Sequence, residues 1–400
     1  MWTEWTIATR FLREGKVQST LILVGIAVGV AVIVFVTALI TGLQANVIDR
    51  TLGTQAHIKV QSAEEANIIL PISPDAAHLI LEDKRAQRLR SINNWQQVRD
   101  LLDTLPRVMA VSPVVTGPAF ARRGDALQSV ALLGVDAPRY LRIIPIQDHM
   151  IGGSFRLGAD DVVIGRQLSQ DLGLGVGDKF RLDGGQGHDR TVNVAGIFEL
   201  GVRELDARYV YLDMKQAQSL LGLPGAATLI DLTVDNIFAA QAIGQHIARL
   251  TGLKVESWME TNSQLMNALR SQSLSTRMIS TFVALSVALG IASVLSISVV
   301  QRTREIGILR AMGTRREQML RVFLIQGALF GFSGALLGGA AGYGLVVAFN
   351  TLGPKLFTVP VDPWLLVAAT ALATVTGILA AAIPARRAAS LDPVEAIRHV

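Results

Sequence analysis

Four long stretches of the chain contain no Asp, Glu, Lys or Arg. Each reaches the roughly 20 residues that a helix needs to cross the hydrocarbon core of a bilayer. Since an unpaired charge is costly in hydrocarbon, such charge-free apolar runs predict transmembrane helices. The predicted spans are residues 19–43, 278–301, 322–350 and 363–385.

The first stretch has a second interpretation, because Arg10, Arg13 and Lys16 precede it as basic residues precede the core of a secretory leader. Its apolar run of about 25 residues is longer than the usual leader core of roughly 7 to 15. No clear small-x-small cleavage site follows it. We therefore expect a retained membrane anchor.

The segment 44–277 between the first two spans alternates short apolar runs with helical patterns, which predicts an α+β domain. At roughly 230 residues, it is long enough to bury its own core. The expected strands are 57–61, 129–135, 161–165, 191–199, 208–213 and 228–234, and the expected helices are 94–105, 167–172, 214–221 and 237–250. The sequence thus predicts a membrane all-α four-helix transmembrane domain joined to an α+β extracytoplasmic domain.

Two connections within this domain have distinctive compositions. The glycine-rich run 183–187 predicts a tight hairpin, because glycine permits positive φ. Residues 64–90 mix charges and prolines with a short apolar run. That mixture favours a solvated excursion over a flap that contacts a partner.

Basic residues in the short loops indicate how the chain is oriented. Cytoplasmic loops carry an excess of Lys and Arg. Arginines and lysines gather in the N-terminal amphipathic segment 1–18, in the loop 302–321 and in the tail 386–400, whereas only Lys355 lies between the last two spans. Both termini and the 302–321 loop are therefore expected in the cytoplasm, and residues 44–277 are expected on the outer side of the inner membrane.

The composition agrees with a chain that is part membrane. Mean hydropathy is +0.41 and 17% of the residues are charged. The net charge of +5 is explained by the loop arginines and does not indicate a nucleic-acid partner. The chain has no cysteine, so the exported domain is expected to be held by its core rather than by disulfides.

Motifs of catalysis and metal binding are missing from the sequence. Its histidines are scattered with no H-E-x-x-H, and neither a G-x-S-x-G elbow nor a G-x-x-x-x-G-K-[ST] phosphate loop is present. We expect no catalytic residue, no metal site and no cofactor in this chain. The charge-free spans also disfavour a transporter driven by protons or sodium.

Small residues recur in the third predicted span at helical spacing. Glycines at such intervals fall on one helix face and let another backbone approach closely. Packing within the chain and dimerisation explain the pattern equally well. The residues are Gly327, Gly331, Gly334, Gly338 and Gly342.

The loop 302–321 predicts a short amphipathic helix that ends near Gly313. Ile306, Leu309 and Met312 recur at helical spacing and are expected on one face, with arginines on the others. Such a helix lies on anionic headgroups or docks into a groove on a cytoplasmic partner.

Three segments together resemble one known family. They are Arg304–Gly313 (REIGILRAMG) directly after a span, the closing run Ile383–Arg398 (IPARRAASLDPVEAIR), and the opening Ala8–Arg13 (ATRFLR) before the first span. The chain resembles the FtsX-like permeases of ABC transporters, a family that includes MacB and the lipoprotein-releasing permeases LolC and LolE.

This resemblance implies a permease that works with a second copy or paralogue and with a dimer of cytoplasmic ATPase subunits that bind ATP and Mg. The helix near 303–313 is then pushed by the ATPases, and the first two spans pass the movement to the outer domain. Contact with the ATPase is expected from Glu305, Gly307, Arg310, Met312 and Gly313, and a cavity for membrane lipids from Val32, Phe35 and Leu39.

Members of this family have several functions, and features of the sequence favour some of these functions over others. MacB carries a fused ATPase, whereas about 18 residues precede the first predicted span here, so the ATPase is expected as a separate subunit. A smaller outer domain is typical of FtsX itself, and the short 183–189 turn stands where LolC-type permeases carry a hook loop. We expect lipoprotein or lipid extraction; adaptor-linked export and regulation of cell-envelope enzymes are the alternatives. The partner outside is then a lipoprotein carrier or a periplasmic adaptor.

Overall fold

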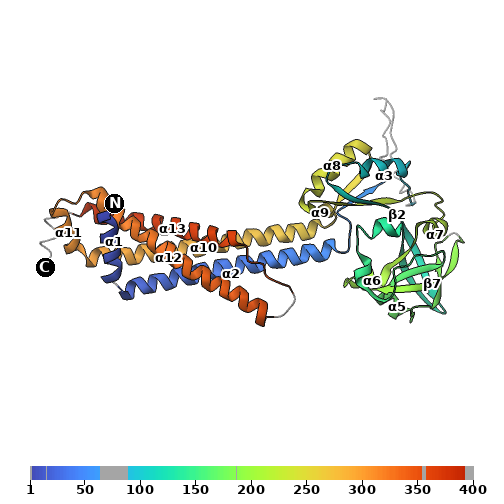
Figure 1. The fold of residues 1–400 in the computed structure, drawn as a ribbon, viewed down its shortest axis with the longest axis horizontal. Coiled ribbons are helices and arrows are strands. Elements are labelled where there is room, and N and C mark those ends of the chain that lie inside the picture. The colour runs from blue at the N-terminus through green and yellow to red at the C-terminus, as the bar shows by residue number, and fades with distance from the viewer. Residues whose placement is uncertain (1, 15, 64–88, 186, 354–356, 392–400) are drawn as a thin grey trace, which may run out of the picture. The chain divides into compact units, whose positions relative to one another are not determined.

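The computed structural model describes residues 2–14, 16–63, 89–185, 187–353 and 357–391 (Figure 1). The chain divides into two compact units. We call residues 1–48 and 267–400 the helical unit and residues 49–266 the α/β unit. Most of the predicted 64–90 excursion and the part of the predicted tail beyond residue 391 lie outside the described residues.

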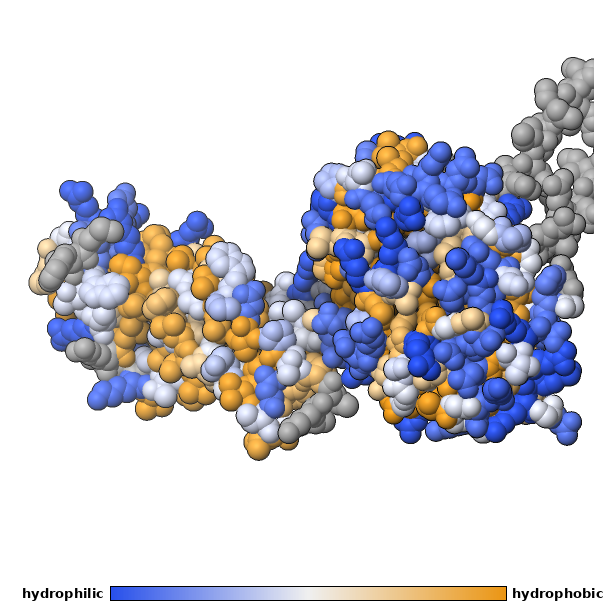
Figure 2. Space-filling view, turned by 45° about the vertical axis from the view of Figure 1, so that its right-hand side comes forward, coloured by the Kyte–Doolittle hydropathy of each residue, from blue (hydrophilic) through white to orange (hydrophobic). Residues whose placement is uncertain are grey.

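The helical unit is built from four long apolar helices and two short ones. The four are long and apolar enough to cross a membrane, as the charge-free runs predicted. The helices are α1 (Trp2–Glu14), α2 (Lys16–Leu52), α10 (Ser263–Gln301), α11 (Thr303–Ala311), α12 (Arg316–Leu352) and α13 (Pro363–Ser390). On the face shown in Figure 2, hydrophobic residues gather along the middle of this unit, and hydrophilic ones gather at the end that carries α1 and α11.

Two of the long helices extend well beyond their predicted spans. Helix α2 has 37 residues and α10 has 39, whereas about 20 suffice to cross the bilayer. Their inner faces pack with α12 and α13 around one apolar core. That core includes Ile26 and Val34 of α2, Leu295 of α10, Phe330 of α12 and Ala373 of α13.

The α/β unit contains a mixed sheet, with α3 and α8 at one end of the unit and α5 and α6 at the other (Figure 1). Its helices are α3 (Trp95–Asp103), α4 (Ala137–Tyr140), α5 (Arg166–Asp171), α6 (Arg203–Arg208), α7 (Met214–Leu220), α8 (Ala240–Thr251) and α9 (Trp258–Thr261), with 3₁₀ turns η1 (Ile146–His149) and η2 (Ile237–Ala239). Its strands are β1 (Ile58–Gln61), β2 (Val108–Arg123), β3 (Ala126–Val135), β4 (Met150–Gly153), β5 (Asp161–Gly165), β6 (Lys179–Asp183), β7 (Asp189–Phe198), β8 (Tyr209–Asp213), β9 (Leu229–Val234) and β10 (Lys254–Ser257).

Strand pairing follows the order β10-β1-β9-β2-β3-β8-β5-β7-β4, and β6 joins β2 to β7. The β3–β8 and β5–β7 pairs are parallel, and the other pairs are antiparallel. Strands β2, β3, β5, β6, β7 and β8 all contribute to one apolar core, which includes Leu132, Ile164, Leu182, Val194 and Leu212.

All six predicted strands and all four predicted helices of this unit are present, with ends shifted by up to three residues. The hairpin prediction is also confirmed, since β6 and β7 pair antiparallel and Gly185 and Gly187 have φ of 84° and 82°. The sequence analysis missed the longest strand, β2, which pairs with β3, β6 and β9. Its Pro113 and Pro118 are residues that normally argue against a central strand.

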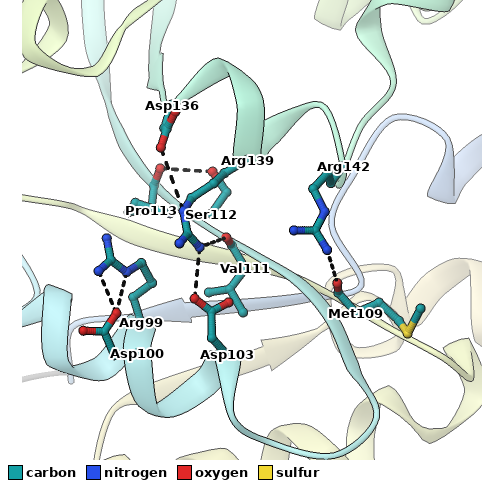
Figure 3. A network of polar contacts seen from close by, with 10 residues as sticks. All are labelled: Arg99, Asp100, Asp103, Met109, Val111, Ser112, Pro113, Asp136, Arg139 and Arg142. Carbon is teal, nitrogen blue, oxygen red and sulfur yellow. Dashed lines mark hydrogen bonds and ion pairs between the residues drawn. The ribbon is translucent and has the colours of Figure 1, made fainter.

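Arginine contacts tie the segment after β3 to α3 and β2 (Figure 3). Arg139 donates to Asp103 Oδ2 at 3.0 Å and to the carbonyl of Val111 at 3.4 Å. Arg142 donates to the carbonyl of Met109 at 3.0 Å. Met109 lies where the β2–β9 register shifts, so Arg142 satisfies an acceptor at this irregular point of the ladder.

A second core of the α/β unit surrounds Tyr211 and lies close to a buried carboxylate. The Tyr211 ring packs against four aromatic rings, those of Phe198, Tyr140, Phe155 and Tyr209, at centroid distances of 5.3, 5.8, 5.9 and 6.3 Å. Asp231 on β9 is 4% exposed. Its burial raises the pKa of the carboxyl to about 6, although Lys59 opposes the rise.

Candidate functional site

Helix α11 (Thr303–Ala311) is a short helix whose ends are set by local sequence. Glu305 lies in its first turn and Arg310 in its last, where each charge complements the helix dipole. The helix ends because Gly313 adopts φ of 99°, a left-handed conformation that favours glycine. The amides of Gly313 and Thr314 then donate to the carbonyls of Arg310 and Leu309, which satisfies the last turn. The predicted end of this helix is confirmed.

One face of α11 packs into its own chain. Ile306 is fully buried in a cluster with Phe323 of α12 and Ala385 of α13. Gly307 is also buried, and the half-buried Arg310 donates to the carbonyl of Leu391. Gly307 and Arg310, two of the residues predicted to contact an ATPase, are therefore occupied by contacts inside the helical unit.

The opposite face of α11 is exposed. Met312 is 74% exposed, so the prediction that it shares a face with the buried Ile306 is wrong. The reason is that α11 ends before Met312, which lies in the turn that follows. Glu305 and Gly313 are exposed, and so is Ile308, which the sequence analysis did not select. Contact of these residues with an ATPase stays a prediction.

Helix α1 is fastened to the start of α11 by contacts that the sequence analysis missed. Arg302 donates to the carbonyl of Phe11 at 2.9 Å, and its guanidinium lies 4.6 Å from the centre of the Phe11 ring. Glu4 is buried and pairs with Arg321 of α12 at 3.6 Å. The signal in the sequence is the spacing of Glu4, Ala8 and Phe11, which places the three on one buried face of α1.

An apolar cavity of about 500 Å³ lies between α2 and α10. Apart from the hydroxyl of Ser286, its lining side chains are apolar, and no charged residue lines it. The lining residues are Leu21, Ile22, Gly25, Ile26, Val28, Gly29, Phe282, Val283, Ser286, Val287, Gly290, Ile291 and Val294.

None of the three residues predicted to form a lipid cavity lines this one. Val32 is exposed, and Phe35 and Leu39 pack in a cluster with Val346 of α12 and Val359. The Phe35 ring contacts the ring of Phe349 at 6.4 Å. All three residues lie further along α2 than Gly29, which is the last residue of α2 that lines the cavity. A lipid contact for these three residues stays a prediction.

Two of the five glycines of α12 give close contact with α13. A Cβ atom on Gly327 would lie 2.4 Å from the carbonyl oxygen of Gly377, and one on Gly331 would lie 2.5 Å from that of Ala373. Both distances are shorter than any Cβ contact permits. The backbones of α12 and α13 therefore touch at these two positions.

The other three glycines face α2 instead. Gly334 lies against the side chain of Ile26, and a Cβ atom on Gly338 would lie 2.5 Å from the carbonyl oxygen of Ala27. Gly342 lies against Val34. Packing within one chain therefore accounts for all five glycines, and they serve two partner helices rather than the single face that the spacing predicted.

The described residues bear on the sequence expectation of no metal site. In the described part of the chain, no group of three His, Cys, Asp or Glu side chains lies close enough to hold a metal ion. The helical unit provides an apolar cavity, an exposed short helix and a set of close contacts between helices.

Comparisons with known proteins cover nearly the whole chain. The MacB-like periplasmic core domain family matches residues 19–250, more than half of the 400 residues, and the FtsX-like permease C-terminal family matches residues 277–393. The chain is 25% identical to "Lipoprotein-releasing system transmembrane protein LolC" of Xylella fastidiosa, over 94% of this chain and 92% of that protein.

Similarity also extends to proteins with a longer chain. "Macrolide export ATP-binding/permease protein MacB" of Shewanella oneidensis is 28% identical over 79% of this chain, and the match spans 50% of that protein. The crystal structure of the periplasmic region of MacB from Actinobacillus actinomycetemcomitans aligns with a TM-score of 0.35 at 12% identity, over 55% of this chain and 95% of that one. The four long apolar helices and the two family matches indicate a membrane protein, and the chain belongs to the FtsX-like, MacB-type family of ABC transporter permeases.

Proposed function

We propose that this chain is the permease subunit of an ATP-driven complex that extracts lipoproteins or lipids at the outer face of the inner membrane. The cavity between α2 and α10 is the observation that carries the proposal. Its lining is apolar except for Ser286. Such a lining accepts acyl chains, because they gain by leaving water and need no hydrogen-bond partner.

The exposed face of α11 is the proposed input of the complex. Ile308 and Met312 present large apolar side chains beside the exposed Glu305, a combination that suits a groove on a protein partner. ATP and Mg are bound outside these 400 residues, which contain no phosphate-binding loop, and a pair of cytoplasmic ATPase subunits supplies the force. We therefore assign ATP hydrolysis to those subunits rather than to this chain.

The proposed orientation places α11 and both termini in the cytoplasm and the α/β unit outside. The arginines of the α11 region and of the end of α13 support it, since basic residues remain on the cytoplasmic side. Helices α2 and α10 belong to both units by sequence. Each is long enough to carry a movement from the membrane into the α/β unit, and a second permease copy or paralogue completes the complex.

Adaptor-linked export is the second candidate function. The similarity to MacB, a protein named for macrolide export, favours it. The short turn between β6 and β7 also favours it, because a hook loop that recruits a lipoprotein carrier would stand there. A regulator of cell-envelope enzymes has the weaker support, because the α/β unit is large.

A pair of phenylalanines allows a direct test of lipid extraction. Phe282 lines the cavity, whereas Phe332 on α12 does not, and both are exposed at 64% and 48%. A photoreactive phenylalanine analogue placed at each position in turn, in cells that express the complex, is irradiated and the adducts are identified by mass spectrometry. We expect acylated protein or lipid at position 282 in excess over position 332.

Three results of that experiment are informative. An adduct with acylated protein supports lipoprotein extraction, and one with lipid alone narrows the substrate to lipid. Equal adducts at both positions would show that the cavity does not select acyl chains, and the proposal would fail in favour of adaptor-linked export.

Coupling to the ATPase is tested by Met312→Asp. The new charge faces the proposed partner groove, so substrate-stimulated ATPase activity should fall about tenfold or more, as expected when a charge enters an apolar contact. Leu352→Asp is the control, because Leu352 is also an exposed apolar residue but ends α12. Equal stimulation in both variants would remove α11 from the proposed contact.

A further inference from the structure

A second apolar cavity, of about 560 Å³, lies at the arginine-rich end of the helical unit. It is formed by the end of α10, the start of α11 and the end of α13, and it shares no lining residue with the cavity between α2 and α10. Its lining residues are Ser296, Ile297, Val299, Val300, Gln301, Thr303, Pro384, Arg387, Ser390 and Leu391.

Apolar and polar groups occupy this cavity in the order of a membrane boundary. Ile297 and Val300 lie within the charge-free span of α10, and both are exposed, Val300 at 74%. Arg387 lies just beyond the charge-free run of α13 and is exposed. One side of the cavity is therefore apolar, which suits the hydrocarbon core, and the other side carries a cation at the level of the lipid headgroups.

The unused hydrogen-bonding groups of the cavity are donors. Within the described residues, the guanidinium of Arg387 has no hydrogen-bond or ion-pair partner, which leaves its planar set of donors available. Gln301 accepts a hydrogen bond from Gln18 Nε2 at 3.1 Å through its Oε1, so its own amide nitrogen remains a donor. The hydroxyls of Thr303 and Ser390 already donate to backbone carbonyls.

The charge around the cavity favours an anionic ligand. In residues 296–310 and 380–400, the sequence has three acidic residues, Glu305, Asp392 and Glu395, and six arginines, which are Arg302, Arg304, Arg310, Arg386, Arg387 and Arg398. A phosphodiester accepts hydrogen bonds and donates none, so it matches both the charge and the donors.

We propose that this cavity is a binding site for an anionic glycerophospholipid of the surrounding leaflet. The phosphate binds Arg387 and the amide of Gln301, and an acyl chain lies along Ile297 and Val300. The bilayer supplies an apolar chain and an anionic headgroup in one molecule, which fits this cavity better than a protein surface does. The site depends only on the chain spanning a membrane, and it is separate from the proposed substrate cavity.

Neighbouring arginines provide a matched test of headgroup binding. The full-length protein is reconstituted into phosphatidylcholine vesicles that contain phosphatidylglycerol with a photoactivatable acyl chain, and labelling near residues 297–300 is measured. One basic residue at an anionic surface contributes about fivefold in affinity, so Arg387→Glu should reduce labelling by at least about fivefold. Arg386→Glu makes the same charge change outside the cavity and should retain most of the label.

Two outcomes would overturn the headgroup assignment. Equal loss in the Arg386 and Arg387 variants would mean that only the general charge of this surface attracts the lipid. Equal labelling of the unsubstituted protein by a photoactivatable phosphatidylcholine would mean that the headgroup is not recognised.

The apolar half of the site is tested independently of charge. Val300→Trp fills the cavity and should displace the label, whereas Leu289→Trp, at an exposed position of α10 that does not line this cavity, should not. The chain contains no cysteine, so Val300→Cys also introduces a unique thiol. Disulfide-linked dimers of that variant under mild oxidation would show that a second copy covers this face, and the lipid site would be rejected.

Discussion

The helical unit and the α/β unit are packed by opposite means. In the helical unit, Gly331 lets α12 touch the backbone of α13 at Ala373. In the α/β unit, the large Tyr211 side chain fills a core between other aromatic rings. Lipid gives helices no hydrophobic reason to associate, so close approach must provide the attraction, whereas water drives large apolar side chains inward. The two units should therefore fail under opposite substitutions.

The largest effect is expected from enlarging a glycine in the helical unit. Gly331→Leu would force α12 away from α13, because the contacted atom is a backbone carbonyl oxygen that cannot rotate away. We expect a loss of at least about 4 kcal/mol, seen as failure to recover a folded protein in mild detergent. Gly344→Leu is the control, since a Cβ atom on that glycine of the same helix would meet no other helix within 4 Å. If both variants were recovered equally, the role given to backbone contact would be wrong.

In the α/β unit, removal of a large buried side chain is expected to be the damaging change. Tyr211→Ala removes a fully buried ring and should lower the free energy of unfolding by about 4 kcal/mol, measured on the full chain by denaturation followed through tryptophan fluorescence. Tyr211→Phe should cost far less, because it keeps the buried ring and removes only the hydroxyl. A large loss in the phenylalanine variant would mean that the hydroxyl, rather than the ring, holds this core.

A pH-dependent effect of Asp231 sharpens the comparison further, because this buried carboxyl lies in the core of the α/β unit. The charged and titratable groups around it are Lys59 on β1 and Tyr140, Tyr209 and Tyr211. Its pKa is raised from 3.8 to about 6, so the folded state binds the proton more tightly than the unfolded state. The stabilisation is complete below pH 3.8 and is lost as the pH rises through about 6.

Asp231→Asn should remove this pH dependence, which amounts to about 3 kcal/mol. The measurement is the unfolding free energy of the full chain between about pH 4 and pH 7. We expect the unsubstituted protein to lose stability over this range relative to the variant. Parallel curves for the two proteins would show that another group causes the pH dependence.

The four long helices and the end of α11 could be predicted because their signals are local. A charge-free run of sufficient length identifies a span wherever it lies in the fold. The stop at Gly313 likewise depends on the conformation of one residue and on carbonyls within one turn. Neither needs knowledge of the rest of the molecule.

Strand β2 could not be predicted from its residues. Pro113 and Pro118 break the pattern of a strand, and six consecutive buried residues replace the usual alternation. The strand exists because β3, β6 and β9 pair with it, and those partners lie far away in sequence. Tertiary pairing thus overrides the local signal.

The candidate site divides in the same way. The sequence located α11 but not its exposed face, because the burial of Ile306 and Gly307 depends on α12 and α13, and the contact of Arg310 depends on Leu391. The glycine spacing predicted close helix contacts, but it could not show that α12 makes them with both α2 and α13. The exposed face of α11 and the partners of these glycines both depend on contacts between segments that lie far apart in the sequence.

The glycines of α12 also determine how sequence can be exchanged between relatives. Helix α12 meets α13 through Gly327 and Gly331 and meets α2 through Gly334, Gly338 and Gly342. A chimera that takes α12 from one relative must therefore take α2 and α13 from the same source. Helix α10 packs into the same core through Ile291 and Leu295, but these five glycines do not face it. Protein design would accordingly treat α2, α12 and α13 as one block when segments are exchanged between relatives.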